Sequence, residues 1–424
     1  MILSNITVPL LGLVDTAVLG HLEHPRFLGA VAIGGNLFTF VFWAFAFLRM
    51  GTTGLVAQAY GKSDWQQLRT TLLQASGLGA LIGGLVILTQ QTLFPLGLSL
   101  MGGSDEVQAL ALQYCQVRVW GTPATLIQFA LIGTCVGLQK PKIALLVLVV
   151  TNVLNIALDL LFVVGLDLNV TGVALATVIA EIVGVLLSIV LLLKTLKHHP
   201  CVTPLTFKSV INRTQITAFF HVNRDLFIRT CCMIFTFAFF TAQGAQQSDV
   251  ILAANAVLIT FLLLIANALD GFANAAEATI GECIGKKAFT LFHAYTETAG
   301  FWCFITALLL TIAFYLGGSW FIGQLTDIEE VAKTAKYYLP WLIAMPLLAF
   351  ISYLLDGVFI GATKSRQMRD VMLVSLIVFF LPVWYISQPL DNHGLWLALI
   401  VFTIARSAMM VLVYRYNNRH EVWY

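Results

Sequence analysis

HHPCVTPLTFKSVINRTQIT, residues 198–217, is the one long polar stretch in this sequence. On both sides of it the chain is a succession of apolar runs separated by short polar breaks. An apolar run needs about 20 residues to cross a bilayer as a helix, and most of these runs reach that length. The stretch therefore predicts two membrane-embedded halves, at 1–197 and 218–424, joined by a linker at 198–217.

The composition is typical of a polytopic membrane protein with almost no domain outside the bilayer. Of the 424 residues, 59% are hydrophobic and 10% are charged, whereas an average soluble domain carries about 25% charged residues. The mean hydropathy is +0.88. The sequence contains no long basic tract and no DNA-binding motif, so we expect membrane lipids and not nucleic acid as partners.

The apolar runs predict an all-α protein with twelve transmembrane helices. Runs of this length do not fit the short strands of a membrane barrel. Several exceed 30 residues and must tilt, bend or extend beyond the hydrocarbon. The first run is short, so either the natural chain begins upstream of Met1 or this helix only just spans. The predicted spans are 2–20, 28–60, 66–90, 106–138, 142–164, 171–196, 218–243, 250–284, 288–316, 329–360, 369–386 and 394–416.

Basic residues are distributed unequally between alternate breaks. The odd-numbered breaks hold Arg26 and little else apart from Lys333 and Lys336, which lie beside acidic residues. Because cytoplasmic loops carry the excess of Lys and Arg, both termini are expected in the cytoplasm. The basic residues of the even-numbered breaks and the C-terminus are Lys62, Arg69, Lys140, Lys142, Lys194, Lys197, Lys208, Arg213, Lys286, Lys287, Lys364, Arg366, Arg369, Arg415 and Arg419.

The two halves align with each other at a constant offset of 224 residues. Each half then carries six predicted helices in the same orientation, related by an axis along the membrane normal. Transporters built in this way bind their substrates between or within the halves. The aligned landmarks are Gly20 with Gly244, Leu28 with Leu252, Gly61 with Gly285, Ala75 with Ala299, Val107 with Val331, Tyr114 with Tyr338, Gly137 with Gly361 and Lys140 with Lys364.

The N-terminal half carries buried polar residues that the repeat does not reproduce. Asp15 lies in LVDTAVLGHL (13–22), where a carboxylate costs about 3 kcal/mol on insertion scales. Its counterpart in the second half is a phenylalanine, as is that of Asn155, and the counterpart of Asp159 is a valine. A polar residue that serves only packing would often recur in both halves, so this set is a candidate for chemistry.

Counting residues from the predicted helix ends places these polar residues at the same depth in the membrane. At about 1.5 Å per residue, Asp15, Asp159 and Thr177 each lie about 8–9 Å below the outer surface. Asn152, Asn155 and Asp159 follow spacings of three and four and so share one helical face. Three helices therefore present polar groups at the same depth, as an enclosed site requires.

Two carboxylates in one dry pocket cannot both stay ionised at low cost, so Asp15 and Asp159 are expected to take up protons as a unit. A sodium site is the alternative if enough oxygens converge on it. A hydrogen-bonded tie between helices is the purely structural interpretation. Pro9, six residues before Asp15, can kink the first helix, either as a switch or as a static bend.

The C-terminal half has a polar stripe in NALDGFANAAEATIGECIG (267–285). Asn267, Asp270, Asn274 and Glu277 lie on one face of the predicted helix. Arg49 and Asp270 fall at similar depths, which predicts an ion pair between the halves. Asn274 and Glu277 are candidates for a second ion or cation site. Three further charges lie within apolar runs without an assigned partner: Arg118, Glu181 and Arg406.

Four segments resemble the MATE family of multidrug and toxic compound exporters, and its DinF branch in particular. They are LLGLVDTAVLGHL (10–22), FLRMGTTGLVAQAYG (47–61), NVLNIALDLLFV (152–163) and NALDGFANAAEATIGECIGKK (267–287). The resemblance covers the whole chain. It implies two six-helix bundles in the plasma (inner) membrane, working as a monomer without a cofactor.

The resemblance also implies a function and site residues. The function is antiport, in which inward ion flow drives the export of amphipathic, often cationic compounds. The coupling ion is H⁺, with Na⁺ as the alternative. Asp15 corresponds to the central coupling residue of the family, and Asn155, Asp159 and Thr177 correspond to its polar partners. A bend at Pro9 upon protonation corresponds to a mechanism proposed for relatives.

Other classes of protein fit the sequence less well. A flippase for lipid-linked precursors, from the same superfamily, would need several cavity arginines, and only Arg49, Arg118 and Arg406 are candidates. An intramembrane metalloprotease would need HExxH, which is absent, and single His and Ser residues lack a paired base. The sequence therefore predicts a transporter and not an enzyme.

Overall fold

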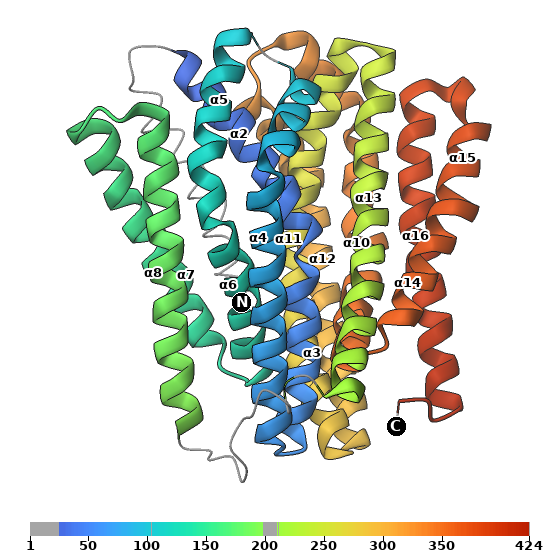
Figure 1. Cartoon of the computed structure of the whole chain (residues 1–424). Coiled ribbons are helices and arrows are strands. Elements are labelled where there is room, and N and C mark those ends of the chain that lie inside the picture. Colours follow the sequence, from blue (N-terminus) through green and yellow to red (C-terminus); the bar gives the residue numbers. More distant parts are fainter. Residues whose placement is uncertain (1–24, 103, 198–209, 211, 424) are drawn as a thin grey trace. The chain divides into compact units, whose positions relative to one another are not determined.

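Helices form nearly all of the computed structural model, which describes residues 25–102, 104–197, 210 and 212–423 (Figure 1). Within these residues, eleven helical spans are long and apolar enough to cross a membrane. The chain divides into two units, with the boundary between Phe220 and His221. The predicted first span, 2–20, lies outside the described residues.

The first unit contains a series of long helices, of which α7 and α8 lie side by side (Figure 1). Its elements are α2 (Pro25–Ala44), α3 (Phe47–Gly61), α4 (Trp65–Met101), α5 (Asp105–Arg118), the 3₁₀ turn η1 (Val119–Gly121), α6 (Thr122–Gly137), α7 (Pro141–Asp159), the π-helical η2 (Leu160–Gly165) and α8 (Asn169–Lys197).

The second unit is also a series of long helices, with α11 and α13 in extensive contact. Its elements are α10 (Arg213–Gln247), α11 (Asp249–Lys286), α12 (Phe289–Leu325), α13 (Glu329–Gly361), α14 (Ser365–Val374), the π-helical η3 (Ser375–Phe380), α15 (Leu381–Ile386), the 3₁₀ turn η4 (Gln388–Leu390) and α16 (Asp391–Arg419). α10 begins before the unit boundary.

Several predicted helix ends were wrong. The third predicted span ended at residue 90, before the polar pair Gln90-Gln91, but α4 continues through Pro95 to Met101. The ninth ended at 316, before Gly317-Gly318, but α12 continues to Leu325. Hydropathy marks where hydrocarbon contact weakens, whereas a helix already formed extends through glutamine at little cost.

Three of the predicted spans are interrupted in the structure, whereas the longest, 250–284, lies within the continuous helix α11. The span 28–60 is broken by a turn at Phe45 and Ala46 between α2 and α3. The span 106–138 passes through η1 ahead of Pro123. The span 369–386 changes from α- to π-helix and back. In each case helical structure continues on both sides of the interruption.

The helix ends of the two units recur at the predicted offset of 224 residues. α4 and α12 begin at Trp65 and Phe289 and end at Met101 and Leu325. The turns between helices also share a left-handed backbone conformation, which residues other than glycine seldom adopt. The matching positions are Ser63 with Lys287, Gln139 with Thr363 and Asp167 with Asp391, all with φ between 50° and 58°.

In each unit a pair of glycines four residues apart lets two helices pack backbone to backbone. A Cβ on Gly133 of α6 would lie 2.5 Å from the carbonyl oxygen of Arg49 on α3, and one on Gly137 would lie 2.8 Å from that of Thr53. Small residues in this spacing let two membrane helices approach backbone to backbone. The second unit repeats the arrangement, with Gly357 and Gly361 of α13 against the carbonyls of Ala273 and Glu277 on α11.

Substitution of Gly133 by alanine is expected to destabilise the first unit by about 1–3 kcal/mol, because the methyl group would meet a backbone oxygen that cannot move aside. Gly84→Ala is the matched control. A Cβ there meets nothing within 4 Å, and alanine favours a helix by up to about 1 kcal/mol over glycine. Thermal unfolding of the purified variants checks this. Equal midpoints for both variants would contradict the close packing.

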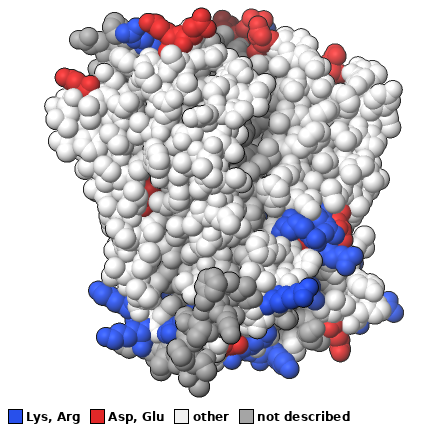
Figure 2. Space-filling view, in the orientation of Figure 1, with Lys and Arg blue, Asp and Glu red and all other residues white. Residues whose placement is uncertain are grey.

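The outward surfaces of the helices are apolar. Leu88, Leu100 and Leu316 are 81%, 82% and 77% exposed, which would be unusual on a soluble protein but suits contact with lipid. On the face drawn in Figure 2, Lys and Arg are frequent toward one end of the helices and Asp and Glu toward the other, and few charged side chains lie between them. The chain is thus an integral membrane protein.

Candidate functional site

α7 has one face toward lipid and one toward the interior of its unit. Val153 is 61% exposed and Leu160, directly after the helix, is 50% exposed. On the other side Asn155 and Asp159 are 1% and 0% exposed. A spacing of four residues places this amide and this carboxylate on the same face, one turn apart.

Asn155 connects α7 to α8 through Thr177. The Asn155 Nδ2 donates a hydrogen bond to the Thr177 Oγ1 at 3.3 Å. The Thr177 hydroxyl in turn donates to the backbone carbonyl of Val173 at 2.9 Å. The Asn155 amide is thereby oriented, with its NH₂ group toward α8. No described residue donates to its Oδ1, although this oxygen is buried.

The site is rich in oxygen acceptors. It contains the Asp159 carboxylate, the Asn155 Oδ1 and the Thr177 hydroxyl. Ionised carboxylates only accept hydrogen bonds, and hard cations bind oxygens of these kinds. A proton on the carboxyl group, or a small cation, is therefore the species that this arrangement suits.

The backbone changes conformation directly after Asp159. α7 ends at this residue and the chain continues as the π-helical segment η2 from Leu160 to Gly165. π-helical turns are rare and occur frequently at functional sites. The buried carboxyl group is therefore held at a point where the helix widens.

Three other residues were predicted to belong to this site: Asn152, Asp15 and Pro9. Asn152 lies one turn before Asn155 and is partly buried. Asp15 and Pro9 lie outside the described residues, so the shared pocket of Asp15 and Asp159 stays a prediction. Among the described residues, no group of three or more His, Cys, Asp or Glu side chains is placed to hold a metal ion.

The stripe on α11 becomes more buried along the helix. Asn267 is exposed and Asp270 partly buried, while Asn274 and Glu277 are 9% and 1% exposed. The ion pair expected between Asp270 and Arg49 would join α11 of the second unit to α3 of the first, and it stays a prediction.

An ion pair between Arg118 and Glu181 was not predicted, although both residues were noted. The Arg118 Nη1 and Nη2 donate to the two Glu181 carboxylate oxygens at 2.8 and 2.6 Å. The Arg118 guanidinium also lies 5.3 Å from the ring centroids of Phe38 and of Phe42. This bidentate ion pair connects α5 to α8 within the first unit.

Depth counting could have found this pair. Arg118 lies about 13 residues after the start of α5, and Glu181 lies about 12 residues after the start of α8. Both helices start at the same end of the unit, so the two charges lie within about 2 Å of the same depth. The sequence feature that points to this ion pair is the presence of single charged residues within apolar runs.

A second buried group, in the second unit, joins three helices. The Asp356 Oδ2 on α13 accepts hydrogen bonds from the Nη2 atoms of Arg229 on α10 and Arg406 on α16. The three residues are 5%, 9% and 4% exposed. The Arg406 guanidinium lies 5.8 Å from the centroid of the Tyr353 ring. The sequence pattern did not single out Arg229.

Sequence comparison detects the family twice along the chain. The family model MatE matches residues 1–161 and 226–386. The "DNA damage-inducible protein F" of Escherichia coli (strain K12) is 39% identical over 428 residues, which cover all of this chain and 92% of that protein. The "Multidrug export protein MepA" of Staphylococcus aureus (strain bovine RF122 / ET3-1) is 21% identical and covers all of this chain and 93% of that protein.

Solved structures with the same fold include MATE transporters. A crystal structure of "MATE in the bent conformation" superposes with a TM-score of 0.87 at 18% identity, covering 98% of this chain and 93% of that one. A MOP superfamily transporter from Pyrococcus furiosus, whose title states that the reverse polarity of its binding pocket suggests a different function, superposes with a TM-score of 0.86 at 18% identity and the same coverage. The resemblance noted in the sequence is confirmed, and this chain belongs to the MatE family, the family of the MATE transporters.

Proposed function

We propose that this chain is a cation-coupled antiporter that exports amphipathic, often cationic compounds across the plasma (inner) membrane, with H⁺ as the coupling ion. Its homologues include a multidrug export protein, and its fold is that of MATE transporters. The observation that carries the proposal is the complete burial of the Asp159 carboxyl group beside the Asn155–Thr177 hydrogen bond.

The mechanism is competition for one site. Asp15 and Asp159 hold protons in one state of the cycle, and in the other their negative charge favours a cationic substrate. The Asn155 amide can donate to Thr177 in both states, so the site keeps its shape while its charge changes. Sodium coupling would use the oxygens of the same residues, Asp15, Asn155, Asp159 and Thr177.

The proposed architecture is twelve helices in two six-helix bundles, at 1–197 and 218–424, with a linker at 198–217. The recurrence of helix ends and left-handed turns at the same offset supports it. The basic residues at one end of the helices support cytoplasmic termini, since Lys and Arg are enriched in cytoplasmic loops (Figure 2). A chain that carries both proposed bundles needs no second copy to supply either of them, which supports a working monomer.

The lipid-linked precursor flippase is the weaker alternative. Such a protein would present unpaired arginines to anionic head groups. Three buried arginines of this chain, Arg118, Arg229 and Arg406, are each bonded to a carboxylate within their own unit. This pairing favours export of cations over transport of anionic lipids.

The test is transport by the full chain reconstituted into liposomes, with proton and sodium gradients imposed separately. Ethidium serves as the amphipathic cation and its fluorescence reports its movement. We expect an imposed proton gradient to drive ethidium movement and a sodium gradient alone to drive none. Protein-free liposomes give the background rate. If only the sodium gradient drives ethidium movement, Na⁺ replaces H⁺ as the coupling ion in the proposal. Ethidium flux that follows neither gradient would overturn antiport.

A further inference from the structure

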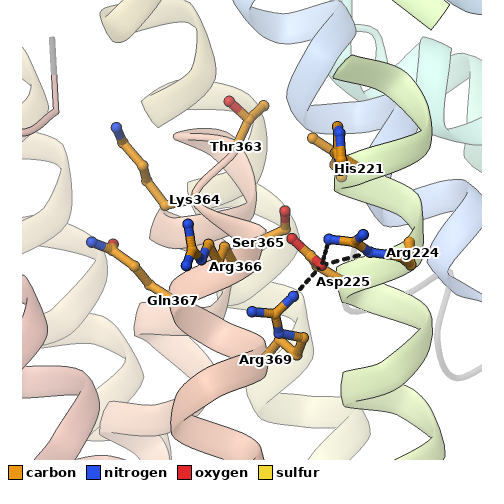
Figure 3. A pocket seen from close by; sticks show the side chains of 10 residues that line it. His221, Arg224, Asp225, Thr363, Lys364, Ser365, Arg366, Gln367 and Arg369 are labelled. Carbon is orange, nitrogen blue, oxygen red and sulfur yellow. Dashed lines mark hydrogen bonds and ion pairs between the residues drawn. The ribbon is translucent and has the colours of Figure 1, made fainter. Parts of the chain in front are cut away.

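The second unit contains a polar pocket that the proposed export mechanism does not use. It lies between α10 and the connection from α13 to α14, and its volume is about 560 Å³ (Figure 3). This connection is one of the basic breaks of the sequence. The lining residues are His221, Val222, Arg224, Asp225, Thr363, Lys364, Ser365, Arg366, Gln367 and Arg369.

The lining has a large excess of positive charge. Asp225 is its only carboxylate, and this residue is buried between two arginines. The Asp225 Oδ1 lies 3.0 Å from the Arg224 Nη2 and 2.7 Å from the Arg369 Nη1, as Figure 3 shows. Lys364 and Arg366 add two more cations, so one carboxylate faces four basic side chains.

A neighbouring carboxylate outside the lining reduces this excess without removing it. Asp370 of α14 lies 2.6 Å from the Arg369 Nη2 and 4.0 Å from the Arg366 Nε. Its side chain is 52% exposed, so solvent screens its charge. Four cations therefore remain against two carboxylates, and the pocket stays positive.

Two arginines of the pocket are accessible to a ligand. The side chains of Arg224 and Arg366 are 54% and 81% exposed, and the Nε and Nη2 of Arg224 donate to Asp225. The side chain of Arg369 is only 17% exposed and is engaged by both carboxylates. Arginine presents a planar set of donors that matches phosphate oxygens in pairs. The two accessible guanidinium groups come from α10 and α14, on opposite sides of the pocket.

The backbone of the pocket adds to the attraction for an anion. α14 begins at Ser365, and among the described residues no side chain caps its first turn. Uncapped N–H groups at a helix N-terminus carry partial positive charge and favour anions. Burial lowers the pKa of the adjacent Lys364, because its ammonium loses hydration. A bound anion would restore favourable contacts to that group.

We propose that this pocket binds a phosphate group carrying net negative charge, held between Arg224 and Arg366 at the N-terminus of α14. Two sources share this chemistry: the head group of an anionic lipid such as phosphatidic acid, and a soluble phosphate compound. The occupant is not the exported cation, because the positive lining repels it. A basic pocket at a membrane helix end suits anionic head groups in general.

The experiment measures binding to the purified full chain in neutral detergent, through the unfolding midpoint followed by tryptophan fluorescence. The probes are inorganic phosphate, dihexanoyl phosphatidic acid and dihexanoyl phosphatidylcholine, all at one ionic strength set with sodium chloride. We expect phosphatidic acid to raise the midpoint and phosphatidylcholine to leave it unchanged. If inorganic phosphate also raises the midpoint, the ligand is a soluble phosphate compound. If only phosphatidic acid raises it, the ligand is a lipid head group.

The variants separate this pocket from general surface charge. Arg224→Gln with Arg366→Gln is expected to weaken binding at least about tenfold, since two charge-assisted contacts are lost. Arg415→Gln with Arg419→Gln removes the same charge from exposed positions on α16 and should leave binding unchanged. If the first double variant does not fold, Arg366→Gln alone replaces it. Absence of any midpoint shift with both anionic probes, or equal binding by both double variants, overturns the proposal.

Discussion

Replacement of Asp356 by asparagine is expected to destabilise the second unit by about 3–5 kcal/mol, the cost of removing one member of a buried charged group. Arg229 and Arg406 both donate to this carboxylate, and all three residues are buried. An amide has the same shape but no charge, so two guanidinium groups would lose the anion they share. The unfolding midpoint and the yield of monodisperse protein in detergent measure the effect.

Two further variants control for this result. Asp356→Glu keeps the charge and should retain part of the stability. Glu106→Gln removes one member of the exposed pair with Arg26, whose side chains are 70% and 40% exposed at 2.8 Å, and should cost only about 0–1 kcal/mol. If Asp356→Asn unfolds at the same temperature as Glu106→Gln, the buried group does not hold α10, α13 and α16 together.

The periodic part of the fold could be predicted from the sequence. A constant offset between the halves matched Gly137 with Gly361, and the structure gives these glycines the same role against the carbonyls of Thr53 and Glu277. This succeeded because close packing of membrane helices allows only small residues at the contact. Hydropathy does not mark the ends of helices that extend beyond the hydrocarbon, such as the end of α4.

The candidate site was predictable where it depends on one helix. The spacing of Asn155 and Asp159 placed both on one face of α7, and both are buried there. Contacts between side chains of different helices were harder to predict from the sequence. Depth counting suits Arg118 and Glu181, whose helices start at a common level. It fails for Arg229 and Asp356, because Arg229 lies about 16 residues after the start of α10 whereas Asp356 lies about five residues before the end of α13.

Replacement of Asp15 by asparagine is expected to abolish export driven by a proton gradient while leaving the fold intact. Asparagine fills nearly the same volume but neither binds nor releases a proton, so proton movement is no longer linked to the substrate. Asp159→Asn removes one of the two carboxyl groups proposed to be coupled, and in that proposal the remaining one titrates alone. This variant should keep some export with an altered pH profile. Ethidium movement in liposomes measures both.

The control is Asp249→Asn, the same chemical change at an exposed position in the first turn of α11, which should behave as the unchanged protein. Asp159 is fully buried, so its carboxyl group requires compensation, and a role in ion exchange and a role as a tie between helices are the two available explanations. They differ in outcome, because a tie affects stability at every pH, whereas an exchanging group changes the pH dependence of transport. Full export by Asp15→Asn at equal expression would exclude the coupling role of that residue, and an unchanged profile for Asp159→Asn would leave only the tie.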